Sequence, residues 1–499
     1  MKSLNYKSTR SNTKTVSASE AIVSGIAQDG GLFVPTAIPT FSLKEIEEMA
    51  SKTYTQKAVT VLSKFLTDFS KEELENCVSG AYDGKFDTEA IVPLSKISDT
   101  SYLLELWHGP TCAFKDMALQ LLPYLMRVSA DKVEEKEKIV ILVATSGDTG
   151  KAALEGFKDV KGTQILVFYP SDGVSSMQKM QMSTQEGENV NVFAIKGNFD
   201  DAQSAVKKLF TDENVSKKLL ENGCKFSSAN SINWGRLVPQ IVYYFSAYCE
   251  LLANEEITLG EAMNVVVPTG NFGNILAAYY AKCMGLPINK LVCASNANNV
   301  LTDFIKTGVY DRNRDFYATV SPSMDILISS NLERFLYHIS GSDEAKISKY
   351  MNELKENGKY EIDETLLTAI HEIFDSGYCD DNDTKETIKT LFDERSYLCD
   401  THTAVAVKVY EDYKARTNDN TKTVIASTAN PYKFPESVLS CFEENKDLSD
   451  FEKLRKINEI TSFEIPKSIS DLENKQIRFN EVISKDDMES KVYQVLGIM

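Results

Sequence analysis

Residues 107–116 read Trp107-His108-Gly109-Pro110-Thr111-Cys112-Ala113-Phe114-Lys115-Asp116. The pair Gly109-Pro110 predicts a turn, and the apolar periodicity that follows predicts an amphipathic helix over 117–128. Lys115 is the only lysine of the stretch, and Phe114 together with the predicted helix should bury it in part. A lysine in a partly dry pocket is disfavoured as an ammonium, and its free amine can attack a carbonyl to form a Schiff base. Most lysines at a helix start are solvated charges, so this interpretation depends on the rest of the chain.

Downstream of this stretch, buried-type strands alternate with helices. The strands are predicted at 139–143, 165–168, 190–195, 225–228, 264–267, 291–294 and 423–427, and a long helix is predicted over 234–253. Apolar runs separated by helices are typical of parallel sheets that are covered on both faces. The sequence therefore predicts an α/β fold.

The segment before this stretch is helical in pattern. Helices are predicted over 18–27, 43–51, 55–66 and 71–81, with a turn and a short strand at 29–35. We predict an N-terminal domain over 1–92 and a second region over 93–499. Within the second region we expect a smaller α/β subdomain at about 138–220 and a charged helical insertion at about 340–395.

Composition narrows the class of protein. The 499 residues carry a net charge of -18, which argues against nucleic acid or an anionic membrane as partner. The nine cysteines include no C-x-x-C pair, so we expect reduced cytosolic thiols and no metal site. The longest nearly uncharged run, 237–249, is too short to span a bilayer. Residues 1–19 are basic and free of acids like a transit peptide, but we expect a mature start and a cytoplasmic monomer.

Two glycine turns sit between a strand and a helix. Residues 145–151 read Thr-Ser-Gly-Asp-Thr-Gly-Lys and fail the nucleotide P-loop pattern, so we predict a helix N-terminus that suits a carboxylate. Residues 268–274 read Pro-Thr-Gly-Asn-Phe-Gly-Asn, where Gly270 and Gly273 let backbone N–H groups approach a phosphate. The second turn is the better phosphate cradle, although it lacks dinucleotide spacing.

Two polar motifs lie near the C-terminal part. Thr428 follows the strand at 423–427, on the edge where ligands bind open α/β sheets, although a threonine there is often only a helix cap. His402 lies in Asp400-Thr401-His402-Thr403; a lone histidine is more often structural than catalytic, and it has no second ligand at metal spacing.

Together these motifs resemble the threonine synthases, pyridoxal-phosphate enzymes of the tryptophan-synthase β-like fold known as fold type II. The matching stretches follow the family's order: 6–10, 29–35, 108–116, 144–150, 230–234, 270–274 and 427–429. The short N-terminal region is similar to the fungal and enterobacterial branch. The resemblance implies a threonine-synthase-type N-terminal domain followed by a pyridoxal-phosphate-dependent catalytic region.

The resemblance also implies residue roles. Lys115 would be the Schiff-base lysine, and Thr428 would face the pyridine nitrogen. The cofactor phosphate would bind at Gly270, Asn271, Phe272, Gly273 and Asn274, and the substrate at Ser146, Asp148, Thr149 and Arg10. The family's usual motif is Ser-Thr-Ala-His-Pro-Ala-Lys-Phe. This chain differs from it at Asn430 and Tyr432, and the difference bears on how the substrate would be positioned.

The implied reaction converts O-phospho-L-homoserine and water to L-threonine and phosphate by γ-elimination and β-addition. Two alternatives stay open: a phospho-lyase that gives 2-oxobutyrate from the same substrate, and a pyridoxal-phosphate-binding regulator without turnover. Retention of Lys115 and both anion loops argues against the regulator.

Overall fold

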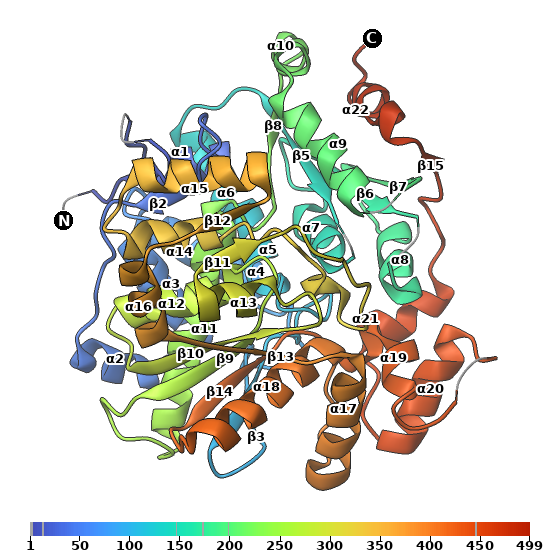
Figure 1. Ribbon diagram of the computed structural model, residues 1–499. Helices are drawn as coiled ribbons and strands as arrows, with labels where there is room; N and C mark the ends of the chain where they lie inside the picture. Colours follow the sequence, from blue (N-terminus) through green and yellow to red (C-terminus); the bar gives the residue numbers. More distant parts are fainter. Residues whose placement is uncertain (1–2, 12–13, 146, 172–173, 198, 445–446) are drawn as a thin grey trace.

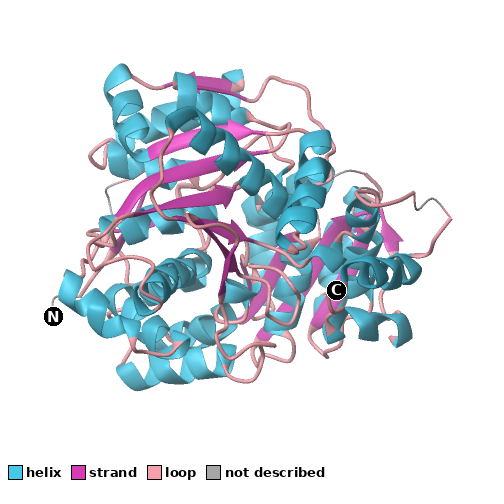
Figure 2. Cartoon of the chain, turned by 90° about the horizontal axis from the view of Figure 1, so that it is seen from below, coloured by secondary structure: helices cyan, strands magenta, loops and turns pink. Residues whose placement is uncertain are grey.

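The structure is a computed structural model that describes residues 3–11, 14–145, 147–171, 174–197, 199–444 and 447–499. Two parallel sheets flanked by helices dominate it (Figures 1 and 2). This arrangement confirms the predicted α/β class.

The larger sheet has the strand order β13-β10-β9-β14-β4-β3. Its strands are β13 (Phe374–Tyr378), β10 (Ile288–Ser295), β9 (Met263–Pro268), β14 (Thr423–Ser427), β4 (Ser101–Glu105) and β3 (Leu94–Lys96). All neighbours are parallel except β3 and β4. The carboxyl ends of β9, β14 and β4 therefore lie together at one edge, and from them emerge the cradle turn, Thr428 and the Lys115 stretch.

The smaller sheet has the order β15-β7-β6-β5-β8 and is parallel throughout. Its strands are β15 (Val482–Ile483), β7 (Val190–Ile195), β6 (Thr163–Pro170), β5 (Lys138–Ala144) and β8 (Cys224–Ser227). Figure 1 shows the C-terminal segment, in red, running along this side of the molecule to reach β7. β5 is followed by α7 (Asp148–Phe157), so Thr145 and Gly147 lie in the connection at the carboxyl end of this strand.

Helices fill the space around the sheets. The first four start at capping boxes whose N-cap residues are Ser17, Ser42, Thr53 and Ser70. They are α1 (Ala18–Ser24), α2 (Leu43–Ala50), α3 (Tyr54–Phe65) and α4 (Lys71–Tyr82), close to the predicted bounds. α11 (Trp234–Ala253) is buried almost all round and packs against α3 and α12 (Gly273–Cys283), so it forms the axis of the largest apolar core.

The remaining elements complete the layers. The helices are α8 (Ser176–Ser183), α9 (Phe199–Thr211), α10 (Glu213–Glu221), α13 (Val300–Thr307), α14 (Leu332–Ile339), α18 (Thr401–Thr417), α19 (Pro435–Leu439), α20 (Asp450–Thr461), α21 (Lys467–Ser470) and α22 (Met488–Leu496). The 3-10 turns are η1 (Pro322–Met324), η2 (Pro431–Lys433), η3 (Asp471–Asn474) and η4 (Lys485–Asp487). β1 (Tyr6–Ser8) pairs with β2 (Phe33–Pro35), and β11 (Val309–Asp311) pairs with β12 (Lys359–Glu361), both antiparallel. No helix in the described ranges is long and apolar enough to cross a membrane.

Two segments differ from the sequence-based prediction. The single helix expected over 117–128 is divided into α5 (Asp116–Leu119) and α6 (Leu122–Lys132), because Pro123 lacks the N–H that would continue α5. The segment 340–395 contains α15 (Glu344–Asn357), α16 (Glu364–Ile373) and α17 (Asp381–Arg395), but also strands β12 and β13. β13 extends the larger sheet, so this segment is not wholly helical. The domain boundaries stay a prediction.

Candidate active site

The Lys115 stretch is tied to the end of β14. The Phe114 N–H donates to the Thr428 carbonyl over 2.8 Å, and Ala113 forms a β-bridge with Ala429. Within the stretch, the Asp116 carboxylate accepts from the Thr111 N–H at 2.8 Å and from its hydroxyl at 2.6 Å. These bonds close the loop and hold Lys115 at the N-cap position of α5.

Lys115 is buried, which confirms the sequence-based prediction. Its Nζ lies 3.5 Å from Asp148 Oδ2 and 4.8 Å from the centre of the Phe114 ring. Burial lowers the pKa of Lys115, and the nearby cations of Lys433 and Arg236 lower it further against the opposing charge of Asp148. The free amine is therefore more accessible than in an exposed lysine.

Asp148 is the central carboxylate of the ion pairs in the site. Its Oδ1 lies 2.8 Å from Lys433 Nζ and accepts from Gln178 Nε2 over 2.7 Å. Burial alone would raise the pKa of Asp148, but the charges of Lys433 and Lys115 outweigh it and hold that pKa well below its ordinary value. The carboxylate is thus ionised and already committed to these neighbours.

The turn before α7 presents backbone donors. The Thr145 hydroxyl accepts from the N–H groups of Gly147 and Gly150 at 3.0 and 2.9 Å. The N–H groups of Asp148 and Thr149 have no acceptor among the described residues and stand at the positive end of α7. Ser146 lies outside the described residues. The assignment of this turn to the substrate carboxylate stays a prediction, and Asp148 would serve it through its N–H, because its carboxylate repels an anion.

In the turn after β9, the backbone carbonyl groups accept hydrogen bonds that fix the conformation of the turn. The Gly270 carbonyl accepts from Ser329 Oγ at 2.7 Å, and the Asn271 carbonyl accepts from the N–H and Nδ2 of Asn331 at 3.1 and 3.0 Å. Phe272 adopts a left-handed conformation with φ 62°. Within the described ranges, the N–H groups of residues 270–275 have no acceptor, so they form a cluster of donors at the start of α12.

These residues fit the phosphate of pyridoxal phosphate. A Cβ added at Gly273 would lie in ordinary van der Waals contact with Asn331 Nδ2 at 3.5 Å, so a larger side chain there would have to displace its neighbours. Asn274 Oδ1 accepts from the Tyr243 and Tyr244 hydroxyls, while its buried Nδ2 has no partner among the described residues. Donors without protein acceptors at a helix N-terminus suit a phosphate.

Thr428 has a hydroxyl available for a ligand. Its N–H donates to Thr403 Oγ1 over 3.2 Å and its carbonyl accepts from Phe114. In the described part of the chain its hydroxyl has no hydrogen-bond partner, although the residue is only 5% exposed. A hydroxyl without a partner among the described residues, next to the Lys115 stretch, fits the predicted contact with the pyridine nitrogen, which stays a prediction.

Arg10 is already paired. Its Nε and Nη2 donate to the two carboxylate oxygens of Glu333 at 2.8 and 2.7 Å. Thr9 also donates to Glu333, the second residue of α14. The contact ties the N-terminal segment to the helix that follows Asn331, and a direct role of Arg10 in substrate binding stays a prediction.

Sequence reasoning missed three residues of this site. Lys433 is fully buried and donates to the Thr111 carbonyl at 2.8 Å as well as pairing with Asp148. Arg236 has a buried Nε that finds no partner in the described part of the chain, and burial lowers the pKa of Arg236 to about 10. Ser323 places its hydroxyl 3.5 Å from Asp148 Oδ2. Of these residues, only Lys433 could have been recognised from the sequence, as a lysine in an otherwise apolar run after a buried strand.

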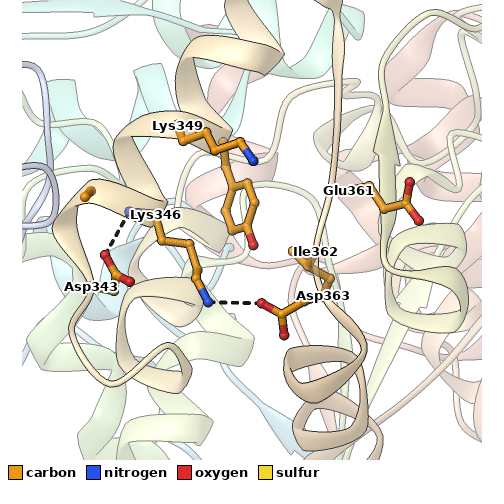
Figure 3. A pocket seen from close by; sticks show the side chains of 8 residues that line it. Asp343, Lys346, Lys349, Glu361, Ile362 and Asp363 are labelled. Atoms are coloured by element: carbon orange, nitrogen blue, oxygen red, sulfur yellow. Dashed lines mark hydrogen bonds and ion pairs between the residues drawn. The ribbon is translucent and has the colours of Figure 1, made fainter.

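A separate hollow of about 620 Å³ lies between α15 and β12 (Figure 3). Lys346 and Asp363, which line it, are joined at 3.0 Å across its floor. The hollow shares no lining residue with the site around Lys115, so the chemistry argued below does not involve it.

Comparisons with known proteins identify the family to which this fold belongs. The model of the family "Pyridoxal-phosphate dependent enzyme" matches residues 89–428. "Threonine synthase N terminus" matches 5–82, and "Threonine synthase, C-terminal" matches 403–492. The fold and the site thus define a pyridoxal-phosphate-dependent enzyme of fold type II.

Individual relatives narrow the family. The threonine synthase of Saccharomyces cerevisiae is 36% identical, over 93% of this chain and 96% of its own. The crystal structure of pyridoxal-phosphate-bound threonine synthase from Brucella melitensis is 36% identical, covers 99% of both chains and has a TM-score of 0.87. The chain belongs to the threonine synthase family. The human "Threonine synthase-like 1" is 40% identical over 90% of this chain, and the chain spans 59% of its length.

Proposed function

We propose that this chain is a threonine synthase, a pyridoxal-phosphate-dependent carbon–oxygen lyase acting on phosphate, that converts O-phospho-L-homoserine and water to L-threonine and phosphate. One observation carries the proposal. Lys115, which is buried and has a lowered pKa, and the cluster of N–H donors at 270–275, which suits a phosphate, follow strands that end at the same edge of the larger sheet. Family membership over nearly the full chain supports it.

The cofactor would be held by residues already described. The N–H groups of 270–275 would bind its phosphate, Lys115 would bind it covalently, and the Thr428 hydroxyl would meet its ring nitrogen. A carboxylate would favour a protonated pyridine nitrogen. A neutral donor such as a threonine hydroxyl does not. When bound, pyridoxal phosphate supplies an electron sink for carbanions next to the substrate's amino group.

Lys115 is the proton carrier of the proposed reaction. Its burial and lowered pKa keep a larger share of its Nζ neutral, which a base needs. Nζ would remove the protons at the substrate Cα and Cβ in turn. The phosphate would leave from Cγ with the bonding electron pair, and Cγ would take up one proton. Water would then add its oxygen at Cβ, and Nζ would return the proton to Cα. Asp148, fixed by Lys433 and Gln178, keeps a negative charge 3.5 Å away and stabilises the protonated amine in between.

The substrate's carboxylate would bind at the N-terminus of α7. The Asp148 and Thr149 N–H groups are without an acceptor in the described ranges. Anchoring the substrate there fixes Cα and Cβ relative to Lys115, and such orientation is worth several kcal/mol, roughly 7 or more in favourable cases. It would also hold the unsaturated product of phosphate loss long enough for water to add.

The test is a product balance. Purified holoenzyme is incubated with O-phospho-L-homoserine, and released phosphate, threonine and 2-oxobutyrate are measured together. We expect threonine to account for most of the phosphate. Absence of phosphate release refutes the enzyme proposal and supports the regulator without turnover.

A phospho-lyase is the second candidate. Its support is the turn where the family's histidine is replaced by Asn430, whose buried Nδ2 has no partner within the described ranges. Asn430 is tied to the Lys115 stretch by its N–H bond to the Cys112 carbonyl at 3.0 Å. If the altered turn positions water poorly, the product balance shifts to 2-oxobutyrate, and an excess of 2-oxobutyrate over threonine decides for the lyase.

We further propose a cytoplasmic monomer with a small-molecule substrate and no nucleic-acid or membrane partner. All nine cysteines are free thiols, which fits a reducing compartment. The net charge of -18 disfavours anionic polymers. Light scattering coupled to size-exclusion chromatography tests the monomer.

A further inference from the structure

Residues 319–331, here called the strap, lie against the cradle turn. Ser329 and Asn331 bond to the carbonyls of Gly270 and Asn271. The Ser323 carbonyl oxygen is only 3.0 Å from the position a Cβ would take on Gly270. The strap is therefore a wall of the cofactor site.

The first part of the strap is held by Asp325. Its carboxylate accepts from the Thr319 N–H at 2.9 Å and the Thr319 hydroxyl at 2.7 Å. It also accepts from Asn296 Nδ2 at 2.8 Å and Asn298 Nδ2 at 2.9 Å. Both asparagines follow strand β10, so the larger sheet fixes the strap on either side of Ser323.

Ser323 is the strap residue that reaches the ion pair. Its hydroxyl lies 3.5 Å from Asp148 Oδ2, the same oxygen that lies 3.5 Å from Lys115 Nζ. A hydroxyl has one proton to donate and two lone pairs. When the proton is directed to Asp148, the lone pairs stay available to a donor that occupies the place beside Lys115.

His402 fixes the backbone of Ser323. Its Nε2 accepts from the Ser323 N–H at 3.1 Å, and its Nδ1 lies 2.8 Å from Asp400 Oδ2. A backbone N–H can only donate, so Nε2 is unprotonated and the proton sits on Nδ1 facing the carboxylate. His402 also packs on the Phe434 ring, with centroids 5.0 Å apart, so the imidazole has one orientation.

We propose that the Ser323 hydroxyl binds the amino group of the phosphorylated amino acid, and that His402 is a positioning residue that acts through the Ser323 backbone. This inference rests on the proposed function. The amino group of an incoming substrate must take the place of Lys115 Nζ beside Asp148. Because Ser323 Oγ and Lys115 Nζ each lie 3.5 Å from Asp148 Oδ2, an amino group in that place would be a neighbour of the Ser323 hydroxyl, which would accept a hydrogen bond from it.

A matched pair of substitutions at His402 distinguishes the effect of how far the side chain reaches from the effect of its size. In His402→Gln, Oε1 lies as far from the backbone as Nε2 and can accept from the Ser323 N–H. In His402→Asn, the side chain reaches only as far as Nδ1, so Asp400 keeps a partner while Ser323 loses its acceptor. Hydrogen exchange of the holoenzyme should speed up in peptides covering 319–331 for His402→Asn, by about tenfold, and stay near wild type for His402→Gln. Equal exchange in both variants overturns the positioning role.

The kinetic test uses Ser323→Ala. We expect kcat/KM for O-phospho-L-homoserine to fall by about tenfold with unchanged cofactor affinity. In the Ser323→Ala background, His402→Asn should add little, because the two residues act on one contact. Unchanged kcat/KM in Ser323→Ala, or fully additive losses, refutes the contact.

The outcome is separable from the proposed function. If wild type releases no phosphate, the proposed function fails, and substrate affinity is then measured by the change in cofactor absorbance on titration with O-phospho-L-homoserine. Weaker binding in Ser323→Ala still supports the contact, and equal binding overturns it. The exchange measurement needs no turnover at all.

Discussion

Replacing His108 by glutamine should remove a pH-dependent part of the stability. The His108 ring lies between two carboxylates, with Nδ1 2.5 Å from Asp87 Oδ1 and Nε2 2.8 Å from Glu105 Oε2. Burial disfavours the charged ring, but the hydrogen bonds to Asp87 and Glu105 outweigh it and raise the pKa of His108 from 6.5 to about 9. The imidazolium thus fastens the start of the Lys115 stretch at neutral pH.

The magnitude follows from linkage. A pKa raised from 6.5 to about 9 corresponds to a ceiling of ~3.4 kcal/mol. Asp87 is 56% exposed, so solvent screens its share, and we expect ~1.5–2 kcal/mol. The sign is that of a group whose pKa is raised on folding. The stabilisation is complete below the unfolded pKa of 6.5 and is lost as pH rises through about 9.

The assay is urea unfolding of wild type and His108→Gln at a fixed cofactor concentration, from a pH of about 6 to about 9.5. The difference between the two free energies of unfolding should be largest at the acid end and shrink through the window. Asp87→Asn serves as control and should lose part of the pH dependence. Taking the difference between the two proteins cancels the pH dependence that other titrating groups, such as buried thiols, contribute to both free energies of unfolding. Parallel pH profiles of wild type and His108→Gln would falsify the clamp.

Further predictions concern the site itself. Lys115→Ala should abolish turnover while the fold survives, and borohydride should fix the cofactor on the wild-type peptide that holds Lys115; labelling at another lysine contradicts the assignment. Gly273→Val should weaken cofactor binding by ~1–3 kcal/mol with little loss of fold, because a β-branched side chain would crowd the backbone N–H groups that the phosphate must approach; unchanged affinity in an equilibrium titration would place the phosphate elsewhere. Thr428→Asp should alter the cofactor spectrum and slow the reaction, and identical spectra and rates would make Thr428 a simple cap. Lys433→Met should destabilise the protein by ~3 kcal/mol or more, because buried Asp148 keeps only one cation in the described part of the chain, Lys115 at 3.5 Å; a Tm equal to wild type would show that the pair is dispensable.

Local patterns predicted most of the framework. The bounds 190–195 and 423–427 for two strands and 234–253 for the longest helix match β7, β14 and α11. Apolar runs and capping residues act within a few positions of the chain, so they can be recognised without tertiary contacts. The same reasoning failed at β13, because a short edge strand between charged helices carries little apolar signal.

The sequence by itself predicted which loops would carry chemistry, because the cradle turn and Thr428 each follow a predicted buried strand and Lys115 lies between a predicted turn and a predicted apolar helix. Parallel strands bring such loops to one edge whatever the details of packing. Only the tertiary structure decided the partners: Asp148 and Lys433 come from distant parts of the chain and meet at 2.8 Å. Likewise, the approach of Ser323 to Asp148 depends on how the strap packs. Contacts of this kind follow from the order of strands and the placement of the two sheets, which no local spacing of residues encodes.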